Sequence, residues 1–166
     1  NKKPIVRSYH PKPSIQQANI EEAAELINQA KKPLILAGHG IHIAHAQEIF
    51  KSFVEKSGIP SASTVHGLSA LPSDHKLNKG MLGMHGNLAP NMLTNSCDLL
   101  IAIGMRFDDR VTGNLSKYAK QAKVIHIEID PAEINKNVMA HVAVHADAKD
   151  AIEALMPLIK EKQYPD

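Results

Sequence analysis

Four charged residues lie close together after an apolar run in the middle of the sequence. Arg106, Asp108, Asp109 and Arg110 follow Leu99–Ile103. A guanidinium group binds carboxylates and phosphates through a planar fork of N–H donors. Asp108 and Asp109 are adjacent, and adjacent side chains of an extended chain point to opposite sides, so they do not form a catalytic pair. The cluster therefore indicates either an anion-binding turn or a salt-bridged loop that closes the end of a buried strand.

The elements around this cluster have the pattern of an α/β protein. Five apolar segments predict strands over residues 33–37, 59–64, 98–104, 123–130 and 141–146, and the sequence leaves room for a sixth. Strands that are apolar on both faces and alternate with helices are typical of a parallel sheet covered on both sides. We therefore predict one doubly wound, mostly parallel sheet of five or six strands, with helices on both faces, in a Rossmann-like arrangement.

Helical spacing of apolar residues predicts helices from residue 19 and over 44–58, 88–96 and 147–162. Asn19 and Glu22 have the spacing of a capping box, Gly58 is placed to end the second helix, and Pro131 is placed to begin a helical turn. Residues 65–80 read as a loop. Residues 1–18, with three prolines, read as an arm or linker, and residues 19–162 as a single domain.

In open parallel sheets, ligands bind beyond the carboxyl ends of the strands. The expected strand ends carry glycine, threonine or charge, at Gly38–Gly40, Thr64–Gly67, the Arg106–Arg110 cluster, Glu128–Asp130 and Ala146–Asp147. This coincidence favours a nucleotide-like ligand over a purely structural domain.

The standard NAD fingerprint is not met. Ile43 occupies the position of its third glycine, and the second strand ends in Thr64 and Val65 instead of an acidic residue. Carboxylates occur later, at Glu128 and Asp130. They fit either ribose binding or capping of the turn at Pro131, and both roles can hold at once.

Other kinds of site are not predicted. The spacing of His39, His42 and His45 spreads their side chains around a helix, so we expect no metal centre. The single cysteine, Cys97, excludes an internal disulfide and a zinc site built from cysteine pairs. No nucleophile motif or P-loop occurs, so we expect no catalytic residue in this chain.

Composition excludes further classes of partner. The formal net charge is +2 and only 4% of residues are aromatic, so no nucleic-acid surface is expected. No apolar stretch is long enough for a membrane helix, and no signal peptide is recognisable. We expect a cytoplasmic protein without a membrane partner. The first residue is not Met, which fits an excerpt of a longer chain.

Three segments, "GMLGMHG" (80–86), "CDLLIAIGMRFDDRVTGN" (97–114) and "HIEIDPAEINKN" (126–137), closely resemble the central domain of the acetolactate synthase large, catalytic subunit. The resemblance covers about residues 15–160. It implies a DHS-like NAD/FAD-binding fold within a chain of three α/β domains. It also implies an enzyme that condenses two pyruvates, or pyruvate and 2-oxobutyrate, in branched-chain amino acid biosynthesis.

In this family the outer domains hold thiamine diphosphate, Mg²⁺ and the catalytic glutamate, and this sequence lacks the thiamine-diphosphate motif. The resemblance therefore implies a fragment that is inert alone. Its implied partners are the missing N- and C-terminal domains, further copies of the enzyme in a homo-oligomer, and a separate regulatory subunit.

The resemblance also implies FAD in this domain, without a net redox step. Glycines would let backbone amides approach phosphate, arginine would suit the diphosphate, and carboxylates would accept ribose hydroxyls. The positions that match the family's FAD contacts are Gly38, His39, Gly40, Thr64, Val65, His66, Leu82, Gly83, Met84, His85, Gly104, Met105, Arg106, Phe107, Asp108, Glu128, Asp130 and Asp147. Asp108 would orient the guanidinium groups, and Asp109 and Arg110 would lie at the substrate channel.

Two other readings remain open. One is the central domain of another thiamine-diphosphate enzyme, of the glyoxylate carboligase, oxalyl-CoA decarboxylase or pyruvate oxidase type. The run "RFDDRVTG" argues against it. The other is a stand-alone nucleotide-binding regulatory domain, which would require this chain to be a complete gene product.

Overall fold

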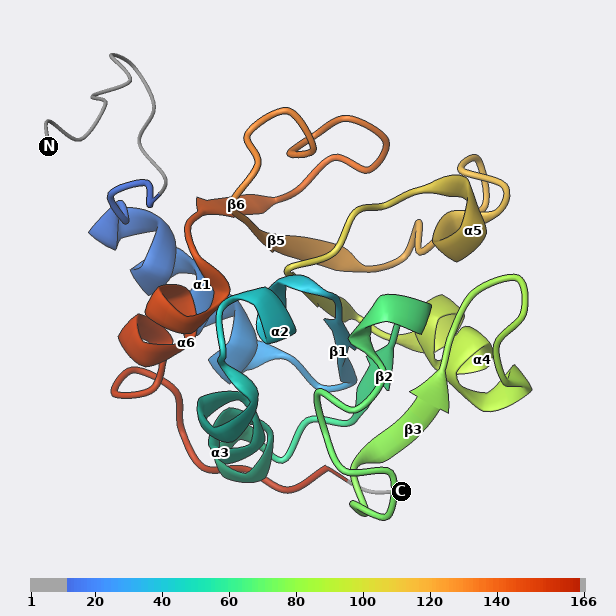
Figure 1. The fold of residues 1–166 in the computed structure, drawn as a ribbon, viewed down its shortest axis with the longest axis horizontal. Coiled ribbons are helices and arrows are strands. Elements are labelled where there is room, and N and C mark those ends of the chain that lie inside the picture. Colours follow the sequence, from blue (N-terminus) through green and yellow to red (C-terminus); the bar gives the residue numbers. More distant parts are fainter. Residues whose placement is uncertain (1–11, 165–166) are drawn as a thin grey trace, which may run out of the picture.

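A computed structural model describes residues 12–164, and the sheet lies at its centre (Figure 1). Six parallel strands pair in the order β3-β2-β1-β4-β5-β6. The strands are β1 (Pro33–Ala37), β2 (Ser61–Ser63), β3 (Asn78–Met81), β4 (Leu99–Ile103), β5 (Lys123–Glu128) and β6 (Val142–His145). The predicted doubly wound α/β fold is confirmed, and the sheet is parallel throughout.

The helices are α1 (Gln17–Gln29), the short α2 (Gly40–Ile43), α3 (Gln47–Ser57), α4 (Leu88–Ser96), the short α5 (Asp109–Thr112) and α6 (Ala148–Leu155), with a 3-10 turn η1 at Val65–Gly67. Helix α1 precedes the first strand, α2 to α5 come between strands, and α6 follows the last strand. Because every strand pair is parallel, all carboxyl ends lie along one edge of the sheet.

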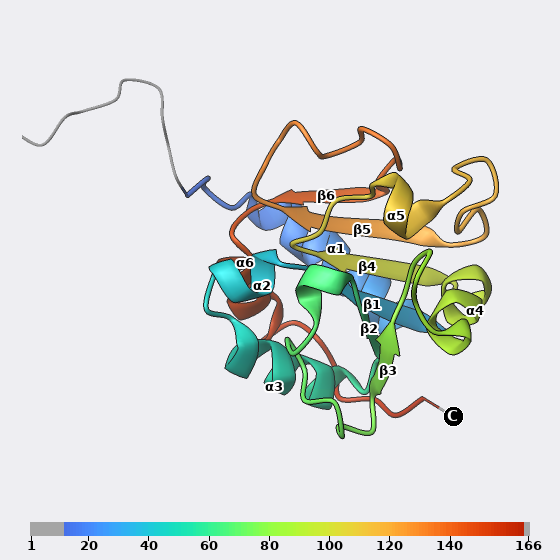
Figure 2. The ribbon, with the colours of Figure 1, turned by 45° about the vertical axis from the view of Figure 1, so that its right-hand side comes forward.

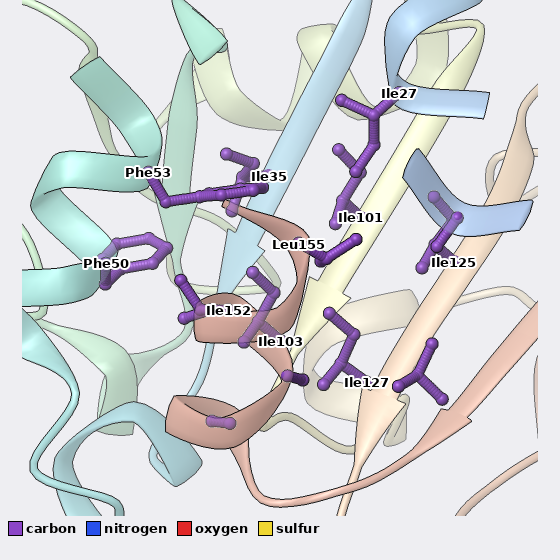
Figure 3. Close-up of a cluster of buried hydrophobic side chains, with 14 of the residues drawn as sticks. Ile27, Ile35, Phe50, Phe53, Ile101, Ile103, Ile125, Ile127, Ile152 and Leu155 are labelled. Atoms are coloured by element: carbon purple, nitrogen blue, oxygen red, sulfur yellow. The ribbon is translucent and has the colours of Figure 1, made fainter. Parts of the chain in front are cut away.

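One face of the sheet is covered by α1, α3 and α6. The side chains that alternate toward it, such as Ile35, Ile101 and Ile125, pack with Phe53 of α3 and Leu155 of α6. Figure 3 shows these side chains meeting between the strands and the helices. A fully buried aliphatic or aromatic side chain contributes roughly 1.5–3 kcal/mol, so this layer accounts for much of the stability of the sheet.

The other face is covered by α4, α5 and the segments on either side of α5 (Figure 2). The alternate strand residues Leu36, Leu100 and Val124 point to this side and pack with Met105 and Phe107. The turn after β4 is therefore part of a core, not a free loop. This matters because the same turn carries the charged cluster noted in the sequence.

Some local expectations are confirmed. The helix expected over residues 88–96 forms as α4, and Gly58 ends α3 with a left-handed φ of 67°. The sixth strand also forms, as β3, although most of it lies in the predicted loop 65–80.

Other expectations are wrong. The capping box is absent: α1 begins at Gln17, and Asn19 donates instead to the carbonyl of Ala143, at 2.9 Å. A hydrogen bond to the neighbouring strand β6 thus replaces the local cap. The closing helix begins at Ala148, after Asp147, and ends at Leu155, well before residue 162. The turn expected from Pro131, by contrast, does form. Most of the predicted arm 1–18 lies outside the described residues.

Candidate functional site

A cavity of about 490 Å³ lies at the carboxyl edge of the sheet. It is bordered by the ends of β1, β2, β4 and β5 and by the segment after β3. The order of the strands reverses between β1 and β4, and doubly wound sheets bind ligands at such a switch point. Most of the expected cofactor residues line the cavity, namely His39, Gly40, Thr64, Val65, His66, Leu82, Met84, His85, Gly104, Met105, Arg106, Asp108 and Glu128, and so does Arg110.

Glycines let the turns after β1 and β4 touch at this switch point. A Cβ on Gly40 would lie 2.6 Å from the Cα of Gly104, and one on Gly38 would lie 2.2 Å from the Gly104 carbonyl oxygen. The amides of Gly38 and Gly40 donate to the carbonyls of Ile103 and Gly104 at 3.0 and 2.9 Å. The amides of these two glycines are therefore bonded within the fold, and the approach of other backbone amides of these turns to a phosphate stays a prediction.

Histidines form the wall between α2 and η1. The Nδ1 atom of His39 lies 3.2 Å from the carbonyl oxygen of His66, and Nε2 of His42 lies 2.9 Å from the carbonyl oxygen of Leu68. The ring centroid of His39 lies 6.0 Å from that of His42 and 5.8 Å from that of His66. These contacts join two segments of the wall. No group of three metal-ligating side chains occurs among residues 12–164.

The arginine–aspartate cluster divides into two pairs. Arg106 Nη2 lies 3.7 Å from Asp108 Oδ2, and Arg110 Nε lies 3.8 Å from Asp109 Oδ2. Asp108 also accepts the amide of Val111, at 3.3 Å, and so caps α5. Exposed ion pairs of this length contribute little to stability. Both guanidinium groups are therefore free to bind a ligand, with Asp108 beside Arg106 as expected, while Asp109 does not line the cavity.

The acidic residues after β5 and β6 have different surroundings. Glu128 is buried, and its Oε1 atom accepts the amides of Ile129 and Asp130 at 2.9 and 3.1 Å. Burial raises the pKa of Glu128, although the two amide donors oppose this. Asp130 accepts the amide of Ala132, and Asp147 caps α6; neither lines the cavity. Ribose binding by Glu128 and Asp130, and a place for Asp147 near the adenine, stay predictions.

The segment after β3 forms another part of the lining. Met84 donates its amide to the carbonyl of Arg110 at 2.9 Å, which ties the segment to α5. A Cβ on Gly83 would lie 2.6 Å from the same carbonyl oxygen, so this contact requires glycine. Gly83 lines a smaller neighbouring cavity of about 330 Å³, together with Asn91 and Tyr118.

Four further residues line the main cavity that the sequence did not indicate: Ile43, Met81, Val111 and Ile129. Ile43 is 69% exposed and Ile129 is 41% exposed. An apolar side chain carries no chemical signal in a sequence, and only its exposure in the fold marks it. Of the expected residues, Phe107 packs into the core instead of the cavity.

The cavity thus combines two kinds of surface. Guanidinium and imidazole groups supply hydrogen-bond donors for an anion, while exposed aliphatic and methionine side chains can cover a flat apolar ring system. Between Lys12 and Tyr164 no helix has both the length and the apolarity needed to cross a membrane.

Comparison with known proteins identifies the family. Residues 20–155 match the thiamine pyrophosphate enzyme central domain. The chain belongs to this family. It is 46% identical, over 160 residues, to a probable acetolactate synthase large subunit of Methanocaldococcus jannaschii, which covers 93% of this chain and 27% of that protein.

Two further relatives agree. Acetolactate synthase 2, chloroplastic, of Nicotiana tabacum is 45% identical over 144 residues, covering 87% of this chain and 21% of that protein. Acetolactate synthase isozyme 2 large subunit of Escherichia coli is 43% identical over 144 residues, covering 87% of this chain and 26% of that protein. The chain thus spans about a quarter of the length of these relatives. The family resemblance seen in the sequence is confirmed.

Proposed function

We propose that this chain is the central domain of an acetolactate synthase large subunit and binds FAD in the cavity at the carboxyl edge of the sheet. The observation that carries the proposal is the composition of that cavity. Arg106, His39 and His66 line it together with Met81, Met84 and other apolar side chains. A flavin dinucleotide needs both kinds of surface, because it has an anionic diphosphate and a large planar ring system.

The residues present fit such a ligand. Arg106 and the histidines can hold the diphosphate, because both supply N–H donors. Glu128 keeps acceptor capacity after its two backbone hydrogen bonds, so it can accept a ribose hydroxyl. Met84 and Arg110 can cover the flavin. Bound FAD is expected to serve as a structural cofactor here, without a net redox step.

The rest of the proposal concerns the whole enzyme. We assign thiamine diphosphate, Mg²⁺ and the catalytic glutamate to N- and C-terminal domains outside this sequence. The complete protein would then condense two pyruvates, or pyruvate with 2-oxobutyrate, as a cytoplasmic homo-oligomer with a separate regulatory subunit. The relatives named above support acetolactate synthase over the other thiamine-diphosphate enzymes, because each is an acetolactate synthase.

A titration with FAD tests the proposal, with flavin fluorescence as the signal. The unchanged chain is expected to show saturable binding, and Arg106→Ala to weaken it at least about tenfold, because a hydrogen bond to a charged group contributes about 1.5–3 kcal/mol. Lys123→Ala is the matched control, since Lys123 is exposed at the first residue of β5, away from the cavity.

Two outcomes would contradict the proposal. Absence of saturable binding by the unchanged chain would refute FAD binding by this domain alone. Equal weakening by Arg106→Ala and Lys123→Ala would refute the location, because it would show that only the net charge matters.

A further inference from the structure

His126 lies in the middle of β5 and is 0% exposed. Its neighbours on the same face of the sheet are aliphatic, including Leu100 and Val124. Its Nε2 atom lies 2.9 Å from the carbonyl oxygen of Met105, and Nδ1 has no hydrogen-bond partner among residues 12–164. A buried imidazole with one unbonded nitrogen destabilises a core unless another contact offsets it. The hydrogen bond with Met105 is one such contact.

This contact fixes the protonation of the ring. A carbonyl oxygen only accepts, so Nε2 must carry the proton that it shares with Met105. Burial lowers the pKa of His126, against the opposing effect of that hydrogen bond. His126 is thus a neutral donor directed at the turn after β4.

The same turn is held at a second residue. The ring of Phe107 meets the ring of His126 edge to face, with centroids 5.0 Å apart. The Phe107 carbonyl oxygen accepts a hydrogen bond from Asn137 Nδ2, at 2.7 Å. Residues on both sides of Arg106 are therefore anchored, whereas, within the part of the chain that the structure describes, the Arg106 side chain makes only the long ion pair with Asp108.

We propose that His126 and Asn137 are positioning residues that hold the backbone of Met105–Phe107 so that Arg106 points into the cavity. The proposal rests on the proposed function only for the ligand that Arg106 would meet. Neither His126 nor Asn137 lines the cavity, so each acts through the turn and does not touch a ligand.

The experiment combines backbone dynamics with FAD binding. ¹⁵N relaxation gives the order parameter of the Arg106 amide in the unchanged chain and in His126→Leu, His126→Gln and Asn137→Ala. Leu fills the core without a donor, Gln restores a donor, and Asn137→Ala removes the second anchor without altering the core. The control is His141→Leu, which removes another histidine bonded to β5, where His141 accepts the amide of Val124 at 3.0 Å.

In the unchanged chain the order parameter of Arg106 is expected near that of rigid backbone, about 0.85. His126→Leu and Asn137→Ala should lower it toward about 0.6, with FAD affinity falling roughly fivefold, as expected for one hydrogen bond. His126→Gln should recover most of both values, and His141→Leu should change neither.

An unchanged order parameter in both His126→Leu and Asn137→Ala would overturn the positioning role, whatever the FAD affinity of these variants. Equal loss of order in His141→Leu would also overturn it, because the effect would then be general. If His126→Leu does not fold, Asn137→Ala decides. Absence of FAD binding by the unchanged chain refutes the proposed function alone, since the order parameters still decide the positioning role.

Discussion

Replacing Gly40 by alanine tests whether the close contact between the turns after β1 and β4 determines both the stability of the chain and its binding of FAD. Gly40 is the first residue of α2, where alanine would ordinarily stabilise by about 0.4–1 kcal/mol by restricting the unfolded chain. In this fold the new Cβ would lie 2.6, 3.1 and 3.3 Å from three backbone atoms of Gly104. Backbone atoms cannot rotate away as a side chain can, so the two turns must separate.

Overpacking of this kind costs about 1–3 kcal/mol. For a chain of this size we therefore expect the thermal midpoint to fall by roughly 3–10 °C. The hydrogen bond from the Gly40 amide to the Gly104 carbonyl oxygen would lengthen from 2.9 Å, and the cavity between the turns would widen. FAD affinity should fall at least severalfold in the same variant.

The measurements are thermal unfolding by circular dichroism and a fluorescence titration with FAD. Gly113→Ala is the comparison: it has a φ of 56°, so alanine is strained there, but its Cβ would have no neighbour within 4 Å and Gly113 lies outside the main cavity. Gly113→Ala should lower the thermal midpoint without weakening FAD binding. If Gly40→Ala leaves both the thermal midpoint and the FAD affinity unchanged, the contact between the two turns determines neither.

Three further predictions concern single side chains. Glu128→Gln should raise the free energy of unfolding at pH 7, because burial raises the pKa of Glu128 and so penalises its charged form. Urea unfolding across pH should show this gain in stability fading as the pH falls through the raised pKa, where Glu128 becomes neutral in the folded chain. Cys97 is buried, which raises the pKa of its thiol to about 12, so a thiol reagent should label it only after unfolding; rapid labelling of the folded chain would contradict this. Asp147→Ala removes the acceptor of two amides at the start of α6 and should lower the free energy of unfolding by about 1 kcal/mol in the same urea assay. The control is Asp109→Ala, which removes an exposed ion pair and should leave the free energy of unfolding nearly unchanged.

The strands were predictable where burial on both faces leaves an aliphatic run. Pro33–Ala37 and Leu99–Ile103 are fully buried, and their sequences consist of little else than aliphatic residues. Asn78–Met81 lies at the edge of the sheet and is only half-buried, so its polar residues resemble a loop. Its pairing with β2 depends on the sheet already being present, which no local pattern records.

The candidate site was predictable as a set of strand ends but not as a set of side-chain directions. Glu128 and Asp130 are separated by one residue and are both acidic, yet only Glu128 lines the cavity. Asp130 instead accepts the amide of Ala132 at 2.9 Å. The choice between ribose binding and capping, open in the sequence, depends on where the strand stops and the chain turns.

The positioning role that we propose for His126 could not be predicted from the sequence either. A histidine within the apolar run "KVIHIE" has the same pattern whether it is a buried core residue or a strand-end ligand. Its distance of 2.9 Å from the Met105 carbonyl oxygen depends on the pairing of β4 with β5, which aligns Ala102 with His126. The residue thus has its role through the register of the sheet.

The geometry of the cavity depends on strand pairing in the same way. Gly40 and Gly104 both line the cavity, and they touch because β1 and β4 pair in register over five residue pairs, from Pro33 with Leu99 to Ala37 with Ile103. A shift of one residue in this pairing would turn the apolar side chains of β4 to the opposite face and separate the two turns. The pairing that buries the core therefore also sets the distance between the walls of the site, so a ligand that bridges the two turns would stabilise the folded chain.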